Sequence, residues 1–309
     1  MRPAGAVLAA LLALGGPVAA QQIDFKRVTH RGDETLSYRW RDAARAEHAV
    51  SFTLTRAAIG EAEASFAEFS MEGMWRQLEA GLRDETRKFG NNARIELARN
   101  GDGLRWTAFA PDKRQSDRLM QLLAERFERD QTVYLSRYLR RRDGHRIMVD
   151  FAGATAALQS PMRAVAEALG KSAPGLNDDR ARLTLALGFF QQIPYARLED
   201  KDRRGGDFLP APALLAQNRG DCDSKAVALA AVLRTYTPGR KFAVVTMPGH
   251  AILAVDLPSD PEDWAIRADG RQFVALEVAG PAMAGVGQVG AATARMLKEG
   301  REVEIWPLN

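Results

Sequence analysis

The sequence predicts an α+β protein with two domains, and three observations lead to this fold class. Apolar and polar residues alternate over residues 23–58, which is typical of strands with one buried face. Apolar residues then recur at near-helical spacing over 60–88. A strongly apolar helical run after residue 222 is followed by short apolar runs that favour strands. The chain has 309 residues, 46% of them apolar, which is enough for two domains of ordinary size.

The first domain is expected to be a small α+β unit over residues 21–145. Its predicted elements are strands containing 36–40 and 50–54, a helix over 60–88, strands at 95–97 and 104–110, and a helix over 117–135 capped by Ser116. His30 and His48 have no metal-ligating neighbour at short spacing, so we expect them to be structural or surface residues. No chemistry is predicted for this domain.

The second domain is expected over residues 146–309, after a polar linker that contains His145. Its predicted helices cover 161–169, 178–192 and the stretch from Cys222 to about 236, with a helical turn at 210–217. Its predicted strands cover 242–247, 250–255 and 273–278, and a short helix and a strand at 303–306 close the chain. Residues 197–207 and 257–271 are polar and are expected to be loops.

Residues 1–20 have the pattern of a cleaved secretory signal. Arg2 is followed by an apolar stretch over 6–14, and Val18-Ala19-Ala20 provides small residues before a cut at Gln21. The alternative is an uncleaved N-terminal anchor. No later stretch is long and apolar enough to cross a membrane, so we expect an exported protein, periplasmic in a Gram-negative source.

The charge of the chain does not favour nucleic acid as a partner. The formal net charge is +4, and the densest basic run is Arg140–Arg142. A nucleic-acid surface would need more basic residues, interleaved with aromatic ones. We interpret this run as a solvated face or linker.

Cys222 is the only cysteine, and it lies where a helix is expected to begin. Exported proteins mostly use cysteines in disulfide pairs, so a lone thiol is either buried and inert or reactive. Asp221 is a suitable N-cap residue, which places Cys222 in the first helical turn at the positive end of the helix dipole. The negative charges of Asp221 and Asp223 raise a thiol pKa, whereas the helix terminus and a protonated histidine lower it. We expect the lowering to prevail and predict an activated nucleophile.

A cysteine nucleophile needs a base and a group that orients the base. His250 is the only histidine after Cys222 and lies at the start of a predicted strand. Asp256 is six residues further along that strand, about 20 Å away, and is too distant. Glu277 lies near the end of the next strand and is the better candidate, although it could instead mark where that strand leaves the core.

Several short motifs resemble the transglutaminase-like family of the papain-like superfamily. They are Gly-Asp-Cys-Asp-Ser-Lys-Ala at 220–226, Pro-Gly-His-Ala at 248–251, the Leu-Glu that ends with Glu277, and Phe-Gln-Gln-Ile-Pro-Tyr at 190–195. The resemblance covers residues 148 to about 290. It implies a papain-like domain with a helical lead-in, a nucleophile helix and an antiparallel sheet.

The resemblance also implies roles for individual residues. Cys222 becomes the nucleophile, His250 the base and Glu277 the third member of a triad, where much of the family has aspartate. The amide of Cys222 and the side chain of Gln191 are the candidate oxyanion donors, although Gln191 could instead pack the helix end. Ile252 stands where many members have tryptophan.

These features predict an exported cysteine-dependent hydrolase or acyltransferase that acts on an amide bond of a protein or peptide through a thioester. Water as the acceptor gives hydrolysis and an amine gives transamidation, and the sequence does not choose between them. No cofactor is assigned, because the chain has no calcium-binding loop and a site of Cys222 with His250 has too few ligands for structural zinc. The alternative is a module with the same fold that binds a partner in the cell envelope without catalysis.

Overall fold

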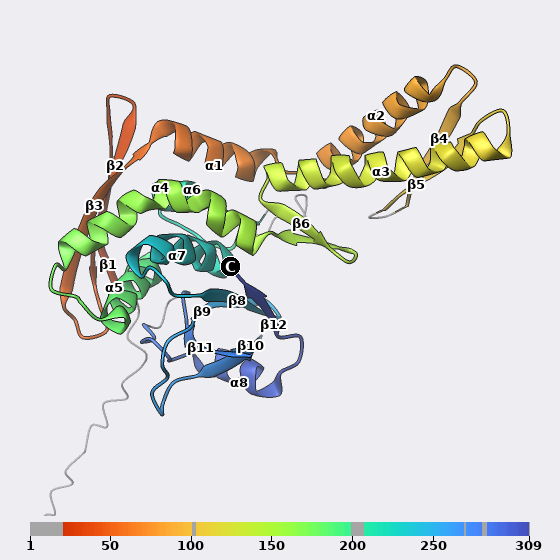
Figure 1. The fold of residues 1–309 in the computed structure, drawn as a ribbon. Helices are drawn as coiled ribbons and strands as arrows, with labels where there is room; N and C mark the ends of the chain where they lie inside the picture. The colour runs from red at the N-terminus through yellow and green to blue at the C-terminus, as the bar shows by residue number, and fades with distance from the viewer. Residues whose placement is uncertain (1–20, 101–102, 199–206, 269, 280–282, 309) are drawn as a thin grey trace, which may run out of the picture.

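The computed structural model describes residues 21–100, 103–198, 207–268, 270–279 and 283–308. The predicted signal segment, residues 1–20, lies outside the described residues. The described chain contains both helices and antiparallel sheets, so the predicted α+β class is confirmed (Figure 1). No helix among the described residues combines the length and the apolar character needed to cross a membrane.

The chain begins with an antiparallel sheet of three strands, β1 (Gln21–His30), β2 (Asp33–Arg41) and β3 (Glu47–Thr55). The alternating apolar residues of β2 and β3 all lie on its buried face, as predicted: Leu36, Tyr38, Trp40, Val50, Phe52 and Leu54. The opposite face carries hydroxyl pairs such as Thr35 with Thr53. Two-residue alternation therefore identified the core face of this sheet.

The predicted helix over 60–88 is two helices, α1 (Arg56–Glu68) and α2 (Met71–Phe89). Phe69 and Ser70 between them are extended. The hydroxyl of Ser70 accepts the amide hydrogen of Gly73 and so caps a new helix, and the Phe69 side chain is buried. The apolar spacing continued across the break, which is why the periodicity did not reveal it.

Two strands and a long helix follow, β4 (Arg94–Asn100), β5 (Gly103–Phe109) and α3 (Lys113–Arg137). The helix begins earlier than predicted, because Asp112 caps it by accepting the Gln115 amide hydrogen. The predicted cap, Ser116, lies inside the helix, where its hydroxyl accepts a hydrogen bond from the Ala110 amide.

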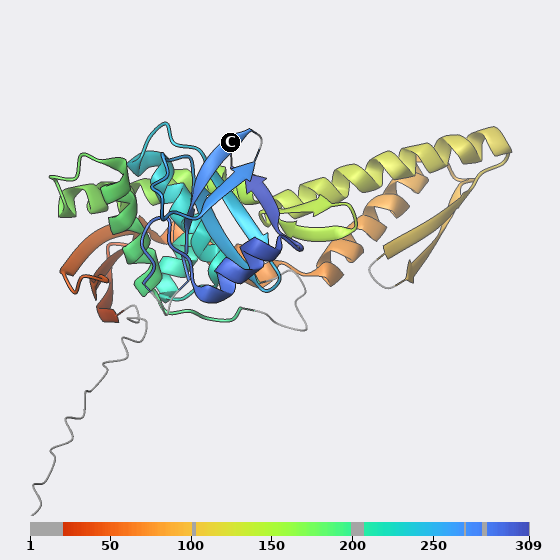
Figure 2. The ribbon, with the colours of Figure 1, turned by 90° about the horizontal axis from the view of Figure 1, so that it is seen from below.

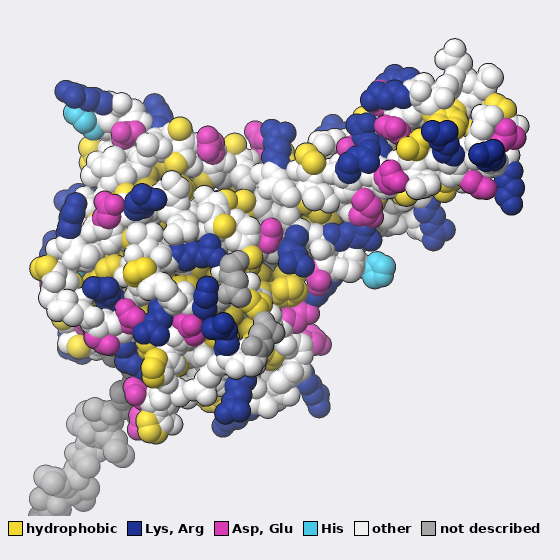
Figure 3. Space-filling view, in the orientation of Figure 1, with side chains coloured by type: hydrophobic (Ala, Val, Ile, Leu, Met, Phe, Trp, Pro, Cys, Tyr) yellow, Lys and Arg dark blue, Asp and Glu magenta, His cyan; other side chains and the backbone are white. Residues whose placement is uncertain are grey.

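Residues 69–138 form an arm that projects from the rest of the protein (Figures 1 and 2). The arm has an apolar core of its own, formed by α2, α3 and the strand pair β4–β5, which includes Met74, Leu78, Leu82, Leu119, Leu123 and Phe127. Basic and acidic side chains are interspersed over its surface (Figure 3). Many of them pair, as Arg99 does with Glu72 and Glu79, so the arm presents a mixed and not a uniformly basic surface.

A hairpin of β6 (Arg140–Asp143) and β7 (Arg146–Val149) connects the arm to α4 (Phe151–Ser172). This helix begins ten residues before the predicted start at 161, because Asp150 caps it by accepting the Gly153 amide hydrogen. Pro161 therefore lies inside the helix and not at its start. One side of α4 packs on α7 and the other on β3.

The remaining elements of the described chain are four helices and five strands. The strands form an antiparallel sheet of order β10-β11-β9-β8-β12. The strands are β8 (Phe242–Met247), β9 (His250–Val255), β10 (Ala265–Ala268), β11 (Arg271–Leu276) and β12 (Glu304–Pro307). The helices are α5 (Asp179–Gln192), α6 (Ala211–Gln217), α7 (Cys222–Tyr236) and α8 (Ala291–Glu299). Strands β8 and β9 have the predicted bounds, whereas β10 lies inside a segment that was predicted to be a loop.

The apolar cores do not follow the expected division at residue 145. The largest core joins the first sheet and α1 to α4, α5, α6, α7 and the inner face of the five-stranded sheet. Phe189 of α5 is at the junction, with its ring centroid 5.1 Å from that of Tyr38, 5.5 Å from Trp40 and 6.3 Å from Phe52. The first sheet is thus part of the unit that carries Cys222, and within the described residues only the arm has a separate core before residue 146.

Candidate active site

Cys222 is the first residue of α7, and its position is fixed from both sides of the helix start. Asp221 is extended and its carboxylate accepts the amide hydrogen of Ser224 at 3.3 Å, so the predicted N-cap is present. On the preceding side, Gly220 donates its amide hydrogen to Pro194 at 3.3 Å and accepts that of Ala196 at 3.1 Å. The Ile-Pro-Tyr segment therefore pairs with the cysteine segment.

Gly220 leaves no room for a side chain at this crossing. A Cβ atom there would lie 2.6 Å from Cδ1 of Leu214, a buried residue of α6. The α6 helix ends at Gln217, and Asn218 after it adopts the left-handed conformation with φ of 50° and turns the chain toward Gly220. The turn at Asn218 and the close packing of Gly220 thus determine where Cys222 lies at the start of α7.

The structure places His250 and Glu277 in contact. His250 begins β9, and Glu277 directly follows β11, the antiparallel neighbour of β9. Nε2 of His250 is 2.8 Å from Oε1 of Glu277, and the Glu277 side chain is only 6% exposed. Asp256 accepts the amide hydrogen of Lys241 instead. Of the two carboxylates considered in the sequence, Glu277 is the one that reaches the imidazole.

Cys222 and His250 line the same cavity, which has a volume of about 230 Å³. Ala251, the residue after His250, lines this cavity too, so Cys222 and the start of β9 face the same space. Glu277 occupies Nε2 of the imidazole, so Nδ1 is the ring nitrogen that Glu277 does not engage. The other lining residues are Phe151, Tyr195, Arg197, Leu198, Asp207, Asp221, Asp223, Thr246, Met247, Gly249 and Ala251.

The Cys222 thiol is protonated in the resting protein, contrary to the expected activation. Burial raises its pKa to about 12, and the charges of Asp223 and Asp221 add to the effect. The Ala251 backbone lowers the pKa of the thiol but does not offset burial. The loss of hydration and the negative charges therefore outweigh the effect that was expected from the helix terminus.

Asp221 and Asp223 form a coupled pair beside the thiol. Burial raises the pKa of both carboxyls, and the charge of Asp221 raises the pKa of Asp223 further. The two side chains share a hydrogen bond, which requires a proton on one of them. Both carboxyls also face the amide hydrogen of Ser224, Asp223 at 2.8 Å and Asp221 at 3.3 Å, so the pair shares this helix amide as well.

Lys225 is a fully buried cation one turn into α7 that the sequence analysis did not consider. Its Nζ donates to the backbone oxygen of Ile193 at 2.5 Å, which ties α7 to the end of α5. Burial lowers its pKa to about 8, against the opposing charge of Asp221. The cation compensates part of the negative charge at the helix start.

The depressed pKa of Lys225 predicts a characteristic pH dependence of stability. Between pH 8 and its unfolded pKa of about 10.4 the folded state releases the proton while the unfolded state keeps it, so the free energy of unfolding rises with pH by about 3 kcal/mol. We expect Lys225→Met to remove this rise. Urea unfolding from pH 7 to 10.5 measures the free energy of unfolding of the Lys225→Met protein and of its parent. Both proteins carry Cys222→Ala, which excludes ionisation of the thiol. Lys171→Met, at an exposed lysine, is the control, and a pH-independent difference between the Lys225→Met protein and its parent would contradict the burial argument.

Gln191 does not serve as the oxyanion donor that was considered for it. Its Nε2 donates to the backbone oxygens of Glu277 at 2.7 Å and of Ala284 at 2.9 Å, so both of its amide hydrogens are used. The neighbouring Gln192 is 3% exposed, and its side-chain amide has no hydrogen-bond partner among the described residues. Of the two predicted oxyanion donors, the backbone amide of Cys222 remains.

Thr293 is a further residue of the site, and the sequence did not indicate it. This threonine of α8 donates a hydrogen bond of 2.7 Å to Oε2 of Glu277. It lies in the first turn of a short helix after a glycine-rich stretch, and no motif marked it. No group of three or more His, Cys, Asp or Glu side chains that could hold a metal ion is present among the described residues.

Comparison with known proteins does not identify the chain. No family model matches it, and neither a curated protein nor a solved structure matches it.

Proposed function

We propose that this protein is a cysteine-dependent hydrolase or acyltransferase that acts on amide bonds. Cys222 is the nucleophile, His250 the general base and Glu277 the group that orients the imidazole. The observation that carries the proposal is the 2.8 Å contact of His250 with Glu277 at a cavity that Cys222 also lines. The resemblance of the cysteine, histidine and glutamate motifs to the transglutaminase-like family supports the same assignment.

The protonated thiol determines the order of events in the proposed reaction. Nδ1 of His250 takes the thiol proton as the sulfur attacks the substrate carbonyl carbon, and an S–C bond forms. The imidazolium then gives this proton to the amide nitrogen, the C–N bond breaks and the amine leaves. The acyl group remains on Cys222 as a thioester, with the Cys222 amide as donor to the oxyanion.

Deacylation repeats the sequence with a different nucleophile. Water or a primary amine loses its proton to His250 and attacks the thioester carbon, and the Cys222 thiol is released with that proton. Glu277 stabilises the imidazolium in both halves of the reaction. The proposed substrate is an exported protein or peptide, and water and amine remain alternative acceptors.

A second candidate is a partner-binding module without catalysis. The observation that favours it is the raised pKa of Cys222, about 12, which is typical of an inert buried thiol. The two candidates differ in whether the thiol can be acylated by a substrate analogue near neutral pH.

Acyl-enzyme trapping tests the proposed function. The full-length protein is mixed with an activated peptide aryl ester at pH 7.5 and quenched in acid, and the intact mass is measured. We expect one acyl group on the wild-type protein and none on Cys222→Ala. Addition of a primary amine or of water alone then identifies the acceptor from the product. An unmodified wild-type protein would favour the binding module.

A further inference from the structure

Glu277 is held by a residue that is not part of the Cys-His-Glu arrangement. Thr293 Oγ1 donates to Oε2 of Glu277 at 2.7 Å, while Oε1 of the same carboxylate faces His250 Nε2 at 2.8 Å. Thr293 is 4% exposed and Glu277 5% exposed, so water does not compete freely for either oxygen. Each carboxylate oxygen thus has a separate partner from a different element, β9 and α8.

We propose that Thr293 is a positioning residue that fixes the Glu277 carboxylate and, through it, the His250 imidazole. The terminal torsion of a glutamate side chain has a broad energy profile, so one hydrogen bond leaves the carboxylate plane free to rotate. A second hydrogen bond to the other oxygen removes that freedom. The proposal rests on the proposed function, because an oriented imidazole matters only if His250 acts as a base.

The length of the glutamate side chain explains why a second hydrogen bond from Thr293 is needed to fix its carboxylate. Compared with aspartate, glutamate has one more methylene and one more rotatable bond, which increases the number of orientations that its carboxylate can adopt. The backbone of Glu277 is fixed as well, because buried Gln191 donates to its carbonyl oxygen at 2.7 Å. The side chain and the main chain of Glu277 are therefore anchored independently.

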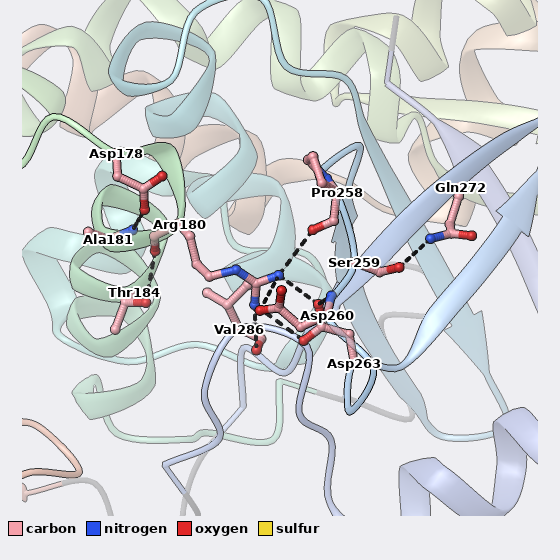
Figure 4. A network of polar contacts seen from close by, with 10 residues as sticks. All are labelled: Asp178, Arg180, Ala181, Thr184, Pro258, Ser259, Asp260, Asp263, Gln272 and Val286. Carbon is pink, nitrogen blue, oxygen red and sulfur yellow. Dashed lines mark hydrogen bonds and ion pairs between the residues drawn. The ribbon is translucent and has the colours of Figure 1, made fainter.

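The segment that leads from Glu277 to Thr293 is anchored to both ends of α5. Gln191, at the end of the helix, also binds the backbone oxygen of Ala284. Arg180, at its beginning, reaches the backbone oxygen of Val286 at 3.5 Å (Figure 4). These contacts hold the described part of the segment, residues 283–290, along the helix.

Asp263 orients Arg180 for this contact. The guanidinium donates two hydrogen bonds to the Asp263 carboxylate, at 2.6 and 3.2 Å, and a third to the Pro258 oxygen (Figure 4). Gly287 fits against the same carboxylate, since a Cβ atom there would lie 1.7 Å from Asp263 Oδ1. Backbone hydrogen bonds of Gly287 with Trp264 and Ala275 complete the attachment. Thr293 is thus presented to Glu277 by a firmly attached segment.

Substitution of Thr293 tests the proposal. Thr293→Val keeps the shape of the side chain but removes the hydroxyl, and Thr293→Ser keeps the hydroxyl. We expect Thr293→Val to slow acylation of Cys222 by the peptide aryl ester about tenfold at unchanged KM, the effect of one lost hydrogen bond to a charged group. Thr293→Ser should remain within about twofold of wild type. Thr184→Val removes a threonine hydroxyl from an exposed helical position and is the matched control.

A spectroscopic measurement separates positioning from a merely structural role. The Nε2 proton of His250, hydrogen-bonded to Glu277, is expected to give a slowly exchanging proton resonance in the NMR spectrum that is absent in His250→Ala. We expect Thr293→Val to accelerate its exchange with water and Thr293→Ser to preserve it. Unchanged exchange together with an unchanged acylation rate in Thr293→Val would overturn the proposal. Thr293→Ala replaces the valine variant if valine prevents folding.

The two readouts also distinguish the failure of this inference from the failure of the proposed function. Wild-type and His250→Ala proteins that acylate equally would remove His250 as the base and overturn the proposed function. The exchange rate of the Nε2 proton would still report whether Thr293 fixes the Glu277 carboxylate. If the wild-type protein is not acylated but its His250 Nε2 proton still exchanges slowly, the proposed function fails. The inference that Thr293 fixes the Glu277 carboxylate then still stands.

Discussion

His250→Ala is expected to slow acylation of Cys222 by the peptide aryl ester about 10²- to 10⁴-fold, the usual contribution of a positioned general base. The reason is the pKa of Cys222, about 12, which leaves the thiol protonated at neutral pH. Without the imidazole, only the small thiolate fraction can attack. Stopped-flow release of the aryl alcohol between pH 6 and 9 measures the acylation rate directly.

The matched control for this substitution is His48→Ala. His48 also contacts a carboxylate, with its Nε2 2.8 Å from Oδ2 of Asp42, but it belongs to the first sheet and does not line the cavity. The His48→Ala variant shows what the loss of a histidine-carboxylate pair away from the cavity does to the acylation rate. We expect the acylation rate to stay at the wild-type value. Equal rates for wild type and His250→Ala would show that the thiol reacts without this base.

Phe189→Ala is expected to lower the free energy of unfolding by about 3–5 kcal/mol, the typical cost of truncating a fully buried phenylalanine. The Phe189 ring is fully buried and packs against Tyr38, Trp40 and Phe52 of the first sheet. The substitution leaves a cavity between that sheet and the helix that ends beside the site. Urea unfolding followed by tryptophan fluorescence measures the change.

Truncation of a ring in the arm is expected to have a different effect from truncation of Phe189 in the shared core. Phe127→Ala truncates a ring in the separate core of the arm, where it contacts Trp106. We expect this variant to destabilise the arm while Cys222 is still acylated at the wild-type rate. Phe189→Ala should expose Cys222 and the first sheet at the same urea concentration. Unfolding of the first sheet at a lower urea concentration than the exposure of Cys222 would contradict the shared core.

The sequence by itself determined the elements whose signals are local. The alternation of β2 and β3, the bounds of β8 and β9 and the Asp221 cap before Cys222 depend on neighbouring residues and their backbone preferences. The end of α5 at Gln192 is also local, because Pro194 disfavours helical conformation at Ile193. Local signals failed at Phe69 and Ser70, because the helical spacing of apolar residues continues across the break between α1 and α2.

Only the tertiary structure decided which buried groups meet. The first sheet joins the core of the site because its apolar face matches α4 and α5, and nothing in its alternation indicates that partner. Gln191 and Thr293 contact Glu277 across 86 and 16 residues of chain, respectively. The pKa of Cys222 depends on how deeply the packed protein buries the thiol. Burial and long-range polar contacts are properties of the assembled fold, so the sequence predicted that Cys222 begins a helix but not how the fold around it affects the pKa of its thiol.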